Sequence, residues 1–162
     1  MITLADYFGD KPHPQEHDVN ARKLLDAVNK YLLACHDNGL YDWPIDPDTG
    51  TNISGAKGGS GDGGYRAADS KTGTAKSAHR TAQAVDVYDP GQVLAKYSDS
   101  PTGRGHLARC GLYIEHPRWT PGWVHFQSVP PRSGKRVYVP YVSPPLVAGW
   151  EGGTPIPFTI KV

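Results

Sequence analysis

Two histidines and one aspartate are the residues of this chain whose types and spacing best suit metal chemistry. His79 and Asp86 lie seven positions apart in the stretch KSAHRTAQAVDVYDP, residues 76–90, and His125 lies in the stretch WVHFQ. Two imidazoles and one carboxylate brought together would form a three-ligand zinc site with an open position for water. Such an ion lowers the pKa of its water to about 7 and polarises a carbonyl group, which suits hydrolysis of an amide.

Two short strands are predicted to carry these side chains. Residues 84–88, AVDVY, alternate in polarity and are β-branched, so Asp86 points away from Val85 and Val87. WVHFQ is a second alternating strand, on which His125 must face solvent or find a partner. An isolated carboxylate on a strand is ordinarily part of an exposed face, so the spacing alone leaves both interpretations open.

The remaining elements indicate a small α+β domain. Residues 18–37 are predicted to form one long N-terminal amphipathic helix, with Asp18 as its N-cap and Gly39 as its C-terminal stop. Its apolar positions at helical spacing are Val19, Leu24, Leu25, Val28, Leu32 and Cys35. Short helices are expected in PGQVLAKYS, with Pro90 in the first turn, and in RGHLARC. LYIEH, WVHFQ and RVYVPYV add strands to a mostly antiparallel sheet, the last two joined by a turn at Pro130–Gly134.

The ends of the chain and its glycine-rich segment are predicted to lie outside these elements. Residues 1–17 read as an extended arm on the domain, and residues 144–162 as a C-terminal wrap that ends in the strand FTIKV. The glycine run in residues 54–64 follows a possible short strand at 51–53 and leads toward the histidine and aspartate stretch. A mobile loop beside a site is therefore favoured over a flexible linker. The 162 residues suit a single domain.

Composition excludes several classes of function. The net charge of +1 gives no electrostatic footprint for nucleic acid or an anionic membrane. No apolar run approaches the roughly 20 residues that span a bilayer. The N-terminus lacks the pattern of a signal peptide, so we expect synthesis in a cytosol. Cys35 and Cys110 read as free thiols, with a bridge between them left open.

Three segments resemble a known family of zinc peptidases. Ser77-x-His79-x-x-Ala82-x-Ala84-x-Asp86 is similar to the Ser-x-His-x-x-Gly-x-Ala-x-Asp signature of the zinc D-alanyl-D-alanine carboxypeptidase superfamily. That superfamily includes D-Ala-D-Ala carboxypeptidases and dipeptidases and phage L-alanyl-D-glutamate endolysins. Gly64-Tyr65-Arg66 resembles the Gly-Tyr-Arg before that signature, and Gly122-Trp123-Val124-His125-Phe126 resembles the segment with the third ligand. The matches fall in the family's order.

The resemblance implies a role for each site residue. His79, Asp86 and His125 would bind Zn²⁺. Arg66 would meet the substrate carboxylate or the developing oxyanion, and its alternative is a surface ion pair. Ser77 would hydrogen-bond near the metal or the substrate, and its alternative is a turn-capping hydroxyl.

Two positions depart from the family pattern. The family's glycine is Ala82 here, and an alanine is strained if that position needs a positive φ. The family's general base is a glutamate, commonly three residues before the third ligand, and that position is Gly122 here. We expect Glu115 to act as the base if LYIEH and WVHFQ pair as antiparallel neighbours. The alternative for Glu115 is an exposed carboxylate at a strand end.

The sequence thus predicts a zinc metallopeptidase that hydrolyses peptidoglycan stem peptide next to a D-amino acid. The resemblance implies a phage or prophage protein that acts at the cell wall after release or as a virion component, and we expect a monomer. The alternative is a catalytically inactive zinc-binding module of the same fold that grips wall peptide or a protein partner, because the missing glutamate is what a loss of catalysis would look like. In a third interpretation, a metal-free phage structural protein, the three ligands coincide by chance.

Overall fold

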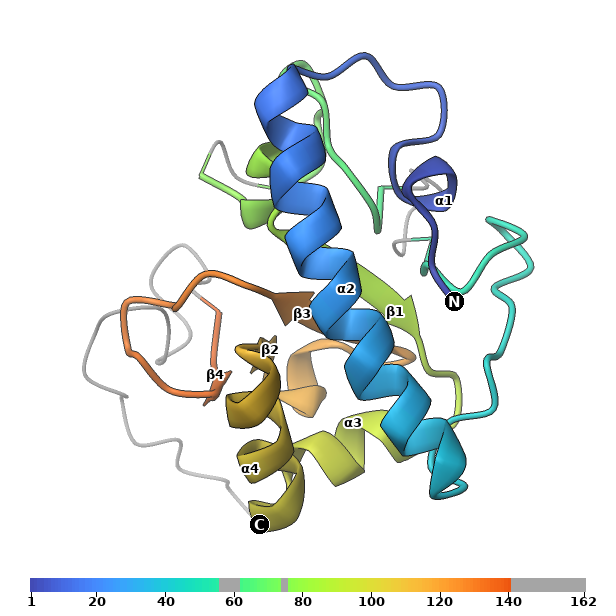
Figure 1. Cartoon of the computed structure of the whole chain (residues 1–162), viewed down its shortest axis with the longest axis vertical. Coiled ribbons are helices and arrows are strands. Elements are labelled where there is room, and N and C mark those ends of the chain that lie inside the picture. Colours follow the sequence, from blue (N-terminus) through green and yellow to red (C-terminus); the bar gives the residue numbers. More distant parts are fainter. Residues whose placement is uncertain (56–61, 74–75, 141–162) are drawn as a thin grey trace, which may run out of the picture.

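The described part of the chain forms a small α+β domain built on one four-stranded sheet (Figure 1). The structure is a computed structural model that describes residues 1–55, 62–73 and 76–140. The elements, in chain order, are α1 (Leu4–Phe8), α2 (Gln15–Asp37), the 3₁₀ turn η1 (Ala78–Thr81), β1 (Ala84–Tyr88), α3 (Val93–Asp99), α4 (Pro101–Cys110), β2 (Tyr113–Glu115), the 3₁₀ turn η2 (Pro117–Trp119), β3 (Trp123–Gln127) and β4 (Val137–Tyr138). The predicted C-terminal wrap and the strand FTIKV lie outside the described residues.

The long helix α2 packs across the sheet, as Figure 1 shows. Its buried stripe meets the apolar face of the sheet, and the rings of Tyr31 and Phe126 lie 5.5 Å apart in an edge-to-face arrangement. The residues buried between helix and sheet include Leu24, Val28, Leu32, Val85, Val87, Ile114, Val124 and Phe126. Because side chains alternate along a strand, Asp86, His125 and Glu115 project from the opposite face. Packing of α2 therefore fixes which face carries the polar residues.

The boundaries of α2 differ from the prediction at the N-terminal end. The helix begins at Gln15, and its N-cap is Pro14, which makes no side-chain capping bond. Asp18 therefore lies within the first turn, where a carboxylate favours the positive end of the helix dipole. Val19 is 51% exposed and lies outside the core, although its spacing matched the apolar stripe.

The sheet has the strand order β1-β3-β2-β4, in which one pair is parallel. Strand β3 pairs antiparallel with both β1 and β2, as the sequence predicts for LYIEH and WVHFQ. Strand β4 pairs parallel with β2 and so lies two strands away from β3, which precedes it in the chain. The register places Asp86 opposite His125, Tyr113 opposite Gln127 and Glu115 opposite Tyr138.

Loop backbone covers the outer edge of β1. The strand predicted at residues 51–53 is reduced to a single bridge between Ile53 and Val87. Other polar groups continue this coverage along the edge. The hydrogen bonds run from Ser54 N–H to Asp86 O (2.8 Å), from Asp86 N–H to Gly63 O (2.7 Å), from Tyr88 N–H to Asn52 O (2.9 Å) and from the Tyr7 hydroxyl to Ala84 O (2.8 Å).

The N-terminal arm and one short helix also differ from prediction. Residues 1–17 are not extended throughout, because a capping box between Thr3 and Asp6 starts α1, which buries Tyr7 and Phe8. Pro90 lies before α3 rather than in its first turn. The Asp89 carboxylate accepts hydrogen bonds from the amides of Leu94 and Ala95. Asp89, which lies four residues before the helix begins, therefore caps its first turn.

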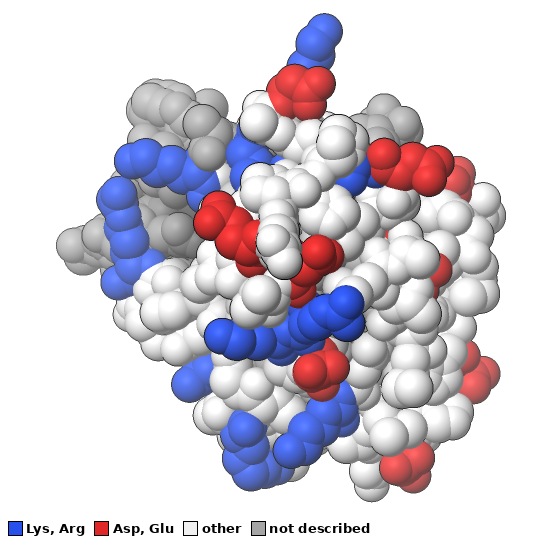
Figure 2. All heavy atoms as spheres, turned by 45° about the horizontal axis from the view of Figure 1, so that its top comes forward, with Lys and Arg blue, Asp and Glu red and all other residues white. Residues whose placement is uncertain are grey.

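The surface charges, the cysteines and the helix compositions are consistent with the expectations from the sequence. Positive and negative side chains are interspersed over the face shown in Figure 2. Both Cys35, which is buried, and Cys110, which is half-buried, are free thiols. Within the described ranges, no helix combines the length and the apolar composition that crossing a bilayer requires.

Candidate metal centre

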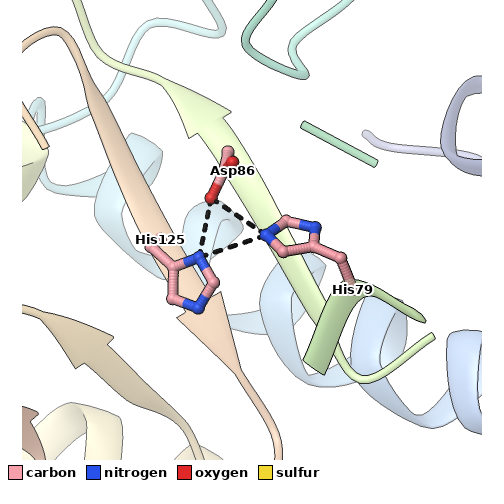
Figure 3. A group of neighbouring side chains, drawn as sticks. All are labelled: His79, Asp86 and His125. Atoms are coloured by element: carbon pink, nitrogen blue, oxygen red, sulfur yellow. Dashed lines mark hydrogen bonds and ion pairs between the residues drawn. The ribbon is translucent and has the colours of Figure 1, made fainter. Parts of the chain in front are cut away.

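His79, Asp86 and His125 converge on the polar face of the sheet (Figure 3). His125 Nδ1 lies 2.7 Å from Asp86 Oδ1, and His79 Nε2 lies 3.4 Å from the same oxygen. The two nitrogen atoms are 3.3 Å apart. The three residues are 1%, 5% and 7% exposed, respectively. The structure therefore brings together the group that the sequence analysis proposed, from η1, β1 and β3.

The orientation of His79 is fixed by a backbone carbonyl. Its Nδ1 lies 2.7 Å from Gly64 O, which can only accept a hydrogen bond. Nδ1 therefore carries the proton in the neutral ring, and the lone pair of Nε2 points at Asp86 and His125. Metal-bound histidines in proteins are commonly held by such a bond from the other ring nitrogen.

The two oxygens of the Asp86 carboxylate have different partners: Arg66 contacts Oδ2, and the two histidines contact Oδ1. Arg66 Nη2 donates to Asp86 Oδ2 over 3.2 Å, and Arg66 Nε donates to the carbonyl of Asp62 over 2.8 Å. Arg66 does form an ion pair, as the alternative to a substrate-binding role held, but Arg66 is only 9% exposed and the pair is buried rather than at the surface. Oδ1 is the oxygen that faces both imidazoles, so Asp86 presents one oxygen to the centre.

The surroundings shift the pKa values of the two histidines in opposite directions. Burial raises the pKa of Asp86, but the neighbouring imidazoles outweigh burial and hold this pKa far below its usual range. Burial lowers the pKa of His79. Burial also disfavours the charged form of His125, but Glu115 and Asp86 outweigh it and raise the pKa of His125 to about 9. Glu115 and Asp86 thus favour the protonated form of the His125 imidazole.

Glu115 lies beside His125, as the predicted strand pairing requires. β2 and β3 are antiparallel, with Ile114 opposite Phe126, so the next position places Glu115 level with His125 on the polar face. The carboxylate is half-buried, and its charge acts on the His125 imidazole. The alternative of an exposed strand-end carboxylate therefore does not describe this position.

A cleft of about 840 Å³ opens over the three residues. Ser77 lines this cleft and makes no side-chain capping bond to η1, so the capping alternative is not observed. The other lining residues include Arg66, Lys76, Glu115, Trp123, Gln127, Arg132 and Tyr138. The chemistry-bearing residues predicted from the sequence thus share one accessible space.

The two departures from the family pattern have visible structural consequences. Ala82 adopts the left-handed conformation, with φ 56° and ψ 37°, and is fully buried, so the expected strain is present. Gly122 has a φ of +94°, a conformation that residues with side chains rarely adopt. A glutamate at position 122 would therefore be strained, and Glu115 supplies a carboxylate from the neighbouring strand instead.

Sequence reasoning missed three groups that surround the centre, two in contact with a ligand and one that contacts it through Gln127. The carbonyl of Gly64 orients His79, and the side chains of Gln127 and Tyr138 lie behind His125. Alternation could have indicated Gln127, which is two positions after His125 on one strand. Tyr138 carried no such signal, because its place depends on the parallel pairing of β4 with β2.

Comparison of the chain with known proteins gives no match. Models of known protein families, curated proteins and solved structures were all searched, and none matches. What the site can do is therefore inferred from its own residues and contacts, together with the resemblance in the three short segments.

Proposed function

We propose that this protein is a zinc-dependent peptidase that hydrolyses peptidoglycan stem peptide next to a D-amino acid. The observation that carries the proposal is the buried convergence of His79 Nε2, His125 Nδ1 and Asp86 Oδ1 within 3.4 Å of one another. Two imidazole nitrogens and one carboxylate oxygen fit a catalytic zinc site, which keeps a fourth position open. The choice of a wall peptide as substrate follows from the resemblance of the segments that hold these ligands.

The side chains around the centre supply the remaining chemistry. A zinc ion held by the three ligands would lower the pKa of a water molecule and polarise the substrate carbonyl. Glu115 would accept the proton of the attacking water and deliver it to the leaving nitrogen. Arg66 already holds Asp86 and also lines the cleft, where its guanidinium would bind a substrate carboxylate or the oxyanion. Ser77 would hydrogen-bond the substrate from the cleft wall.

The charge of the cleft supports an acidic peptide as substrate. Lys76 and Arg132 line it in addition to Arg66, and both are exposed. Within the described residues, neither forms an ion pair. Stem peptides carry free carboxylates, which such cations attract.

Metal analysis and a cleavage assay test the proposal together. Purified protein should contain about one zinc per chain, as expected for a single three-ligand site. With defined muropeptides it should release new amino groups, detected by mass spectrometry, and lose this activity with chelator until zinc is restored. The metal measurement should include iron and manganese. Wild-type protein that binds no divalent metal after exposure to zinc would overturn the proposal.

One observation favours a second candidate, an inactive zinc-binding module. The usual position of the catalytic glutamate is Gly122, whose φ of +94° disfavours a side chain. If the protein is such a module, it would retain zinc and bind muropeptides without cutting them. Titration of the zinc-loaded protein with muropeptides, followed by product analysis, separates this candidate from the peptidase.

A further inference from the structure

We propose that Gln127 and Tyr138 are positioning residues that present Nδ1 of His125, rather than Nε2, to the metal. This inference rests on the metal centre of the proposed function and deepens it by assigning the residues that prepare one ligand. The inference is based on a chain of hydrogen bonds that runs from Tyr138 on β4 through Gln127 to Nε2 of the His125 ring.

The directions of these hydrogen bonds follow from the groups involved. Gln127 Nε2 donates to the carbonyl of Val129 over 2.6 Å, which identifies the other amide atom as the oxygen. The Tyr138 hydroxyl donates to that oxygen, Oε1, over 2.6 Å. His125 Nε2 lies 3.3 Å from the same Oε1 and therefore donates to it as N–H. In the neutral ring Nδ1 is then left with a lone pair that points at Asp86.

The Val129 carbonyl prevents the Gln127 amide from turning over, because a carbonyl can only accept a hydrogen bond. A turned amide would direct its oxygen at this carbonyl and would remove from His125 and Tyr138 the oxygen to which both now donate. All these groups are packed in the protein, because Gln127 is 4% exposed and Tyr138 is 3% exposed. Water cannot readily replace the lost bonds there, so the amide keeps one orientation.

The fixed amide opposes a competing arrangement of the His125 proton. Asp86 Oδ1 lies 2.7 Å from Nδ1, and a carboxylate is a strong acceptor, so by itself it would draw the ring proton to Nδ1. A proton on Nδ1 would remove the lone pair that the metal needs. An acceptor at Nε2 favours the other tautomer, and Gln127 supplies it. Tyr138 reaches Gln127 across β2, so the parallel strand β4 contributes directly to the ligand geometry.

The tautomer itself is tested in the wild-type protein by ¹⁵N NMR of the imidazole rings. In zinc-loaded protein, His125 should show a metal-bound Nδ1 and a protonated Nε2, whereas His79 should show the opposite pattern, with Nε2 bound. A metal-bound Nε2 at His125 would overturn the inference. If the wild-type protein binds no zinc, the proposed function fails and this inference fails with it.

Variants separate positioning from mere folding. Gln127→Met keeps the size of the side chain but removes the acceptor, and it should weaken zinc affinity about 10–100-fold, as loss of a residue that orients a metal ligand typically does. Gln127→Glu restores an acceptor for His125 but faces the Val129 carbonyl, so its affinity should lie between Gln127→Met and the wild type. Tyr138→Phe should weaken zinc affinity, and Tyr88→Phe on β1 is the matched control that should leave it unchanged.

The measurement is a competition titration with a chromophoric chelator, with folding of each metal-free variant checked by circular dichroism. Wild-type zinc affinity in folded Gln127→Met would overturn the inference while leaving the proposed metal centre intact. If Gln127→Met does not fold, the comparison of Tyr138→Phe with Tyr88→Phe and the NMR assignment of the wild type still decide it.

Discussion

Each of the three proposed ligands is held by a second group that selects its ligand atom. The Gly64 carbonyl accepts a hydrogen bond from Nδ1 of His79, so Nε2 of that ring faces the centre. Arg66 donates to Oδ2 of Asp86, so Oδ1 faces the centre. Gln127 accepts from Nε2 of His125, so Nδ1 faces the centre. Three electron-pair donors are thus oriented toward one point. Ligand atoms that are oriented in advance by a second group are typical of metal sites, which is the residue-scale argument for a metal.

Replacement of Glu115 by Gln tests the assignment of the general base. The amide cannot accept the proton of water, so the rate of muropeptide cleavage should fall about 10²–10⁴-fold. Zinc content should stay near the wild-type value, because Glu115 is not a proposed ligand. Glu16→Gln is the matched control, since that side chain is 80% exposed on α2. Cleavage at the wild-type rate by Glu115→Gln would show that another group acts as the base.

The stability of chelator-treated protein should depend on pH with a maximum near 6.5. The pKa of His125 is raised from 6.5 to about 9, so its contribution is fully present below pH 6.5 and is lost as the pH rises to about 9. This loss amounts to about 3 kcal/mol at most. The pKa of His79 is lowered, so its contribution is lost as the pH falls below 6.5.

Urea unfolding of the metal-free protein at pH 6.5 and pH 9 measures the His125 contribution. The free energy of unfolding should be lower at pH 9. His125→Gln removes the titrating group and should abolish most of that difference. An equal decrease in His125→Gln would assign the pH dependence to other residues.

At the scale of elements, local patterns predicted the strands that carry the ligands. Residues 84–88 and 123–127 alternate over their whole length, and both form strands with these bounds. Antiparallel pairing then placed two ligands together. Features set by distant contacts were not predictable: α3 starts where the Asp89 carboxylate caps it, and β4 is placed by parallel pairing that leaves no local signal.

Gly64 links the N-terminal segment to the metal centre, and Gly64→Ala tests that link. A Cβ at this position would lie 2.4 Å from the carbonyl oxygen of Tyr7, so the backbone must shift. The shift would move the Gly64 carbonyl away from His79. We expect a loss of about 1–3 kcal/mol in the free energy of unfolding and about 10-fold or weaker zinc binding.

Gly105→Ala is the matched control for this substitution. The Cβ at position 105 would meet only the Arg109 side chain, at 3.8 Å, within a helix that favours alanine. Its stability should equal or exceed that of the wild type, with zinc affinity unchanged. Calorimetric titration and urea unfolding measure both quantities, and wild-type values for Gly64→Ala would contradict the proposed link.

At the scale of the whole molecule, the centre exists only in the folded chain. Its contacts run from Gly64 to Tyr138, and all four strands contribute a residue to the polar face. The sequence predicted the fold class and the single domain, because one long helix and alternating strands set them. It did not predict the strand order, since several orders bury the same apolar residues.

Metal removal should therefore lower the melting temperature of the protein. A ligand that binds only the native state at 100 times its Kd stabilises by about 2.7 kcal/mol. For a chain of this size, that corresponds to a shift of about 5–10 °C. Differential scanning calorimetry with zinc and with chelator measures it. His79→Ala should show no zinc-dependent shift, and a wild type that melts equally with and without zinc would argue against a bound structural ion.

The covered edge of β1 affects how these molecules meet one another. An edge strand with unpaired amides and carbonyls is a template on which another chain can add a strand and begin to aggregate. Along β1 those groups are already engaged by Asn52, Ser54, Gly63 and the Tyr7 hydroxyl. The outer edge of β1 therefore offers few free amides and carbonyls to a strand from another molecule, which opposes self-association at this edge.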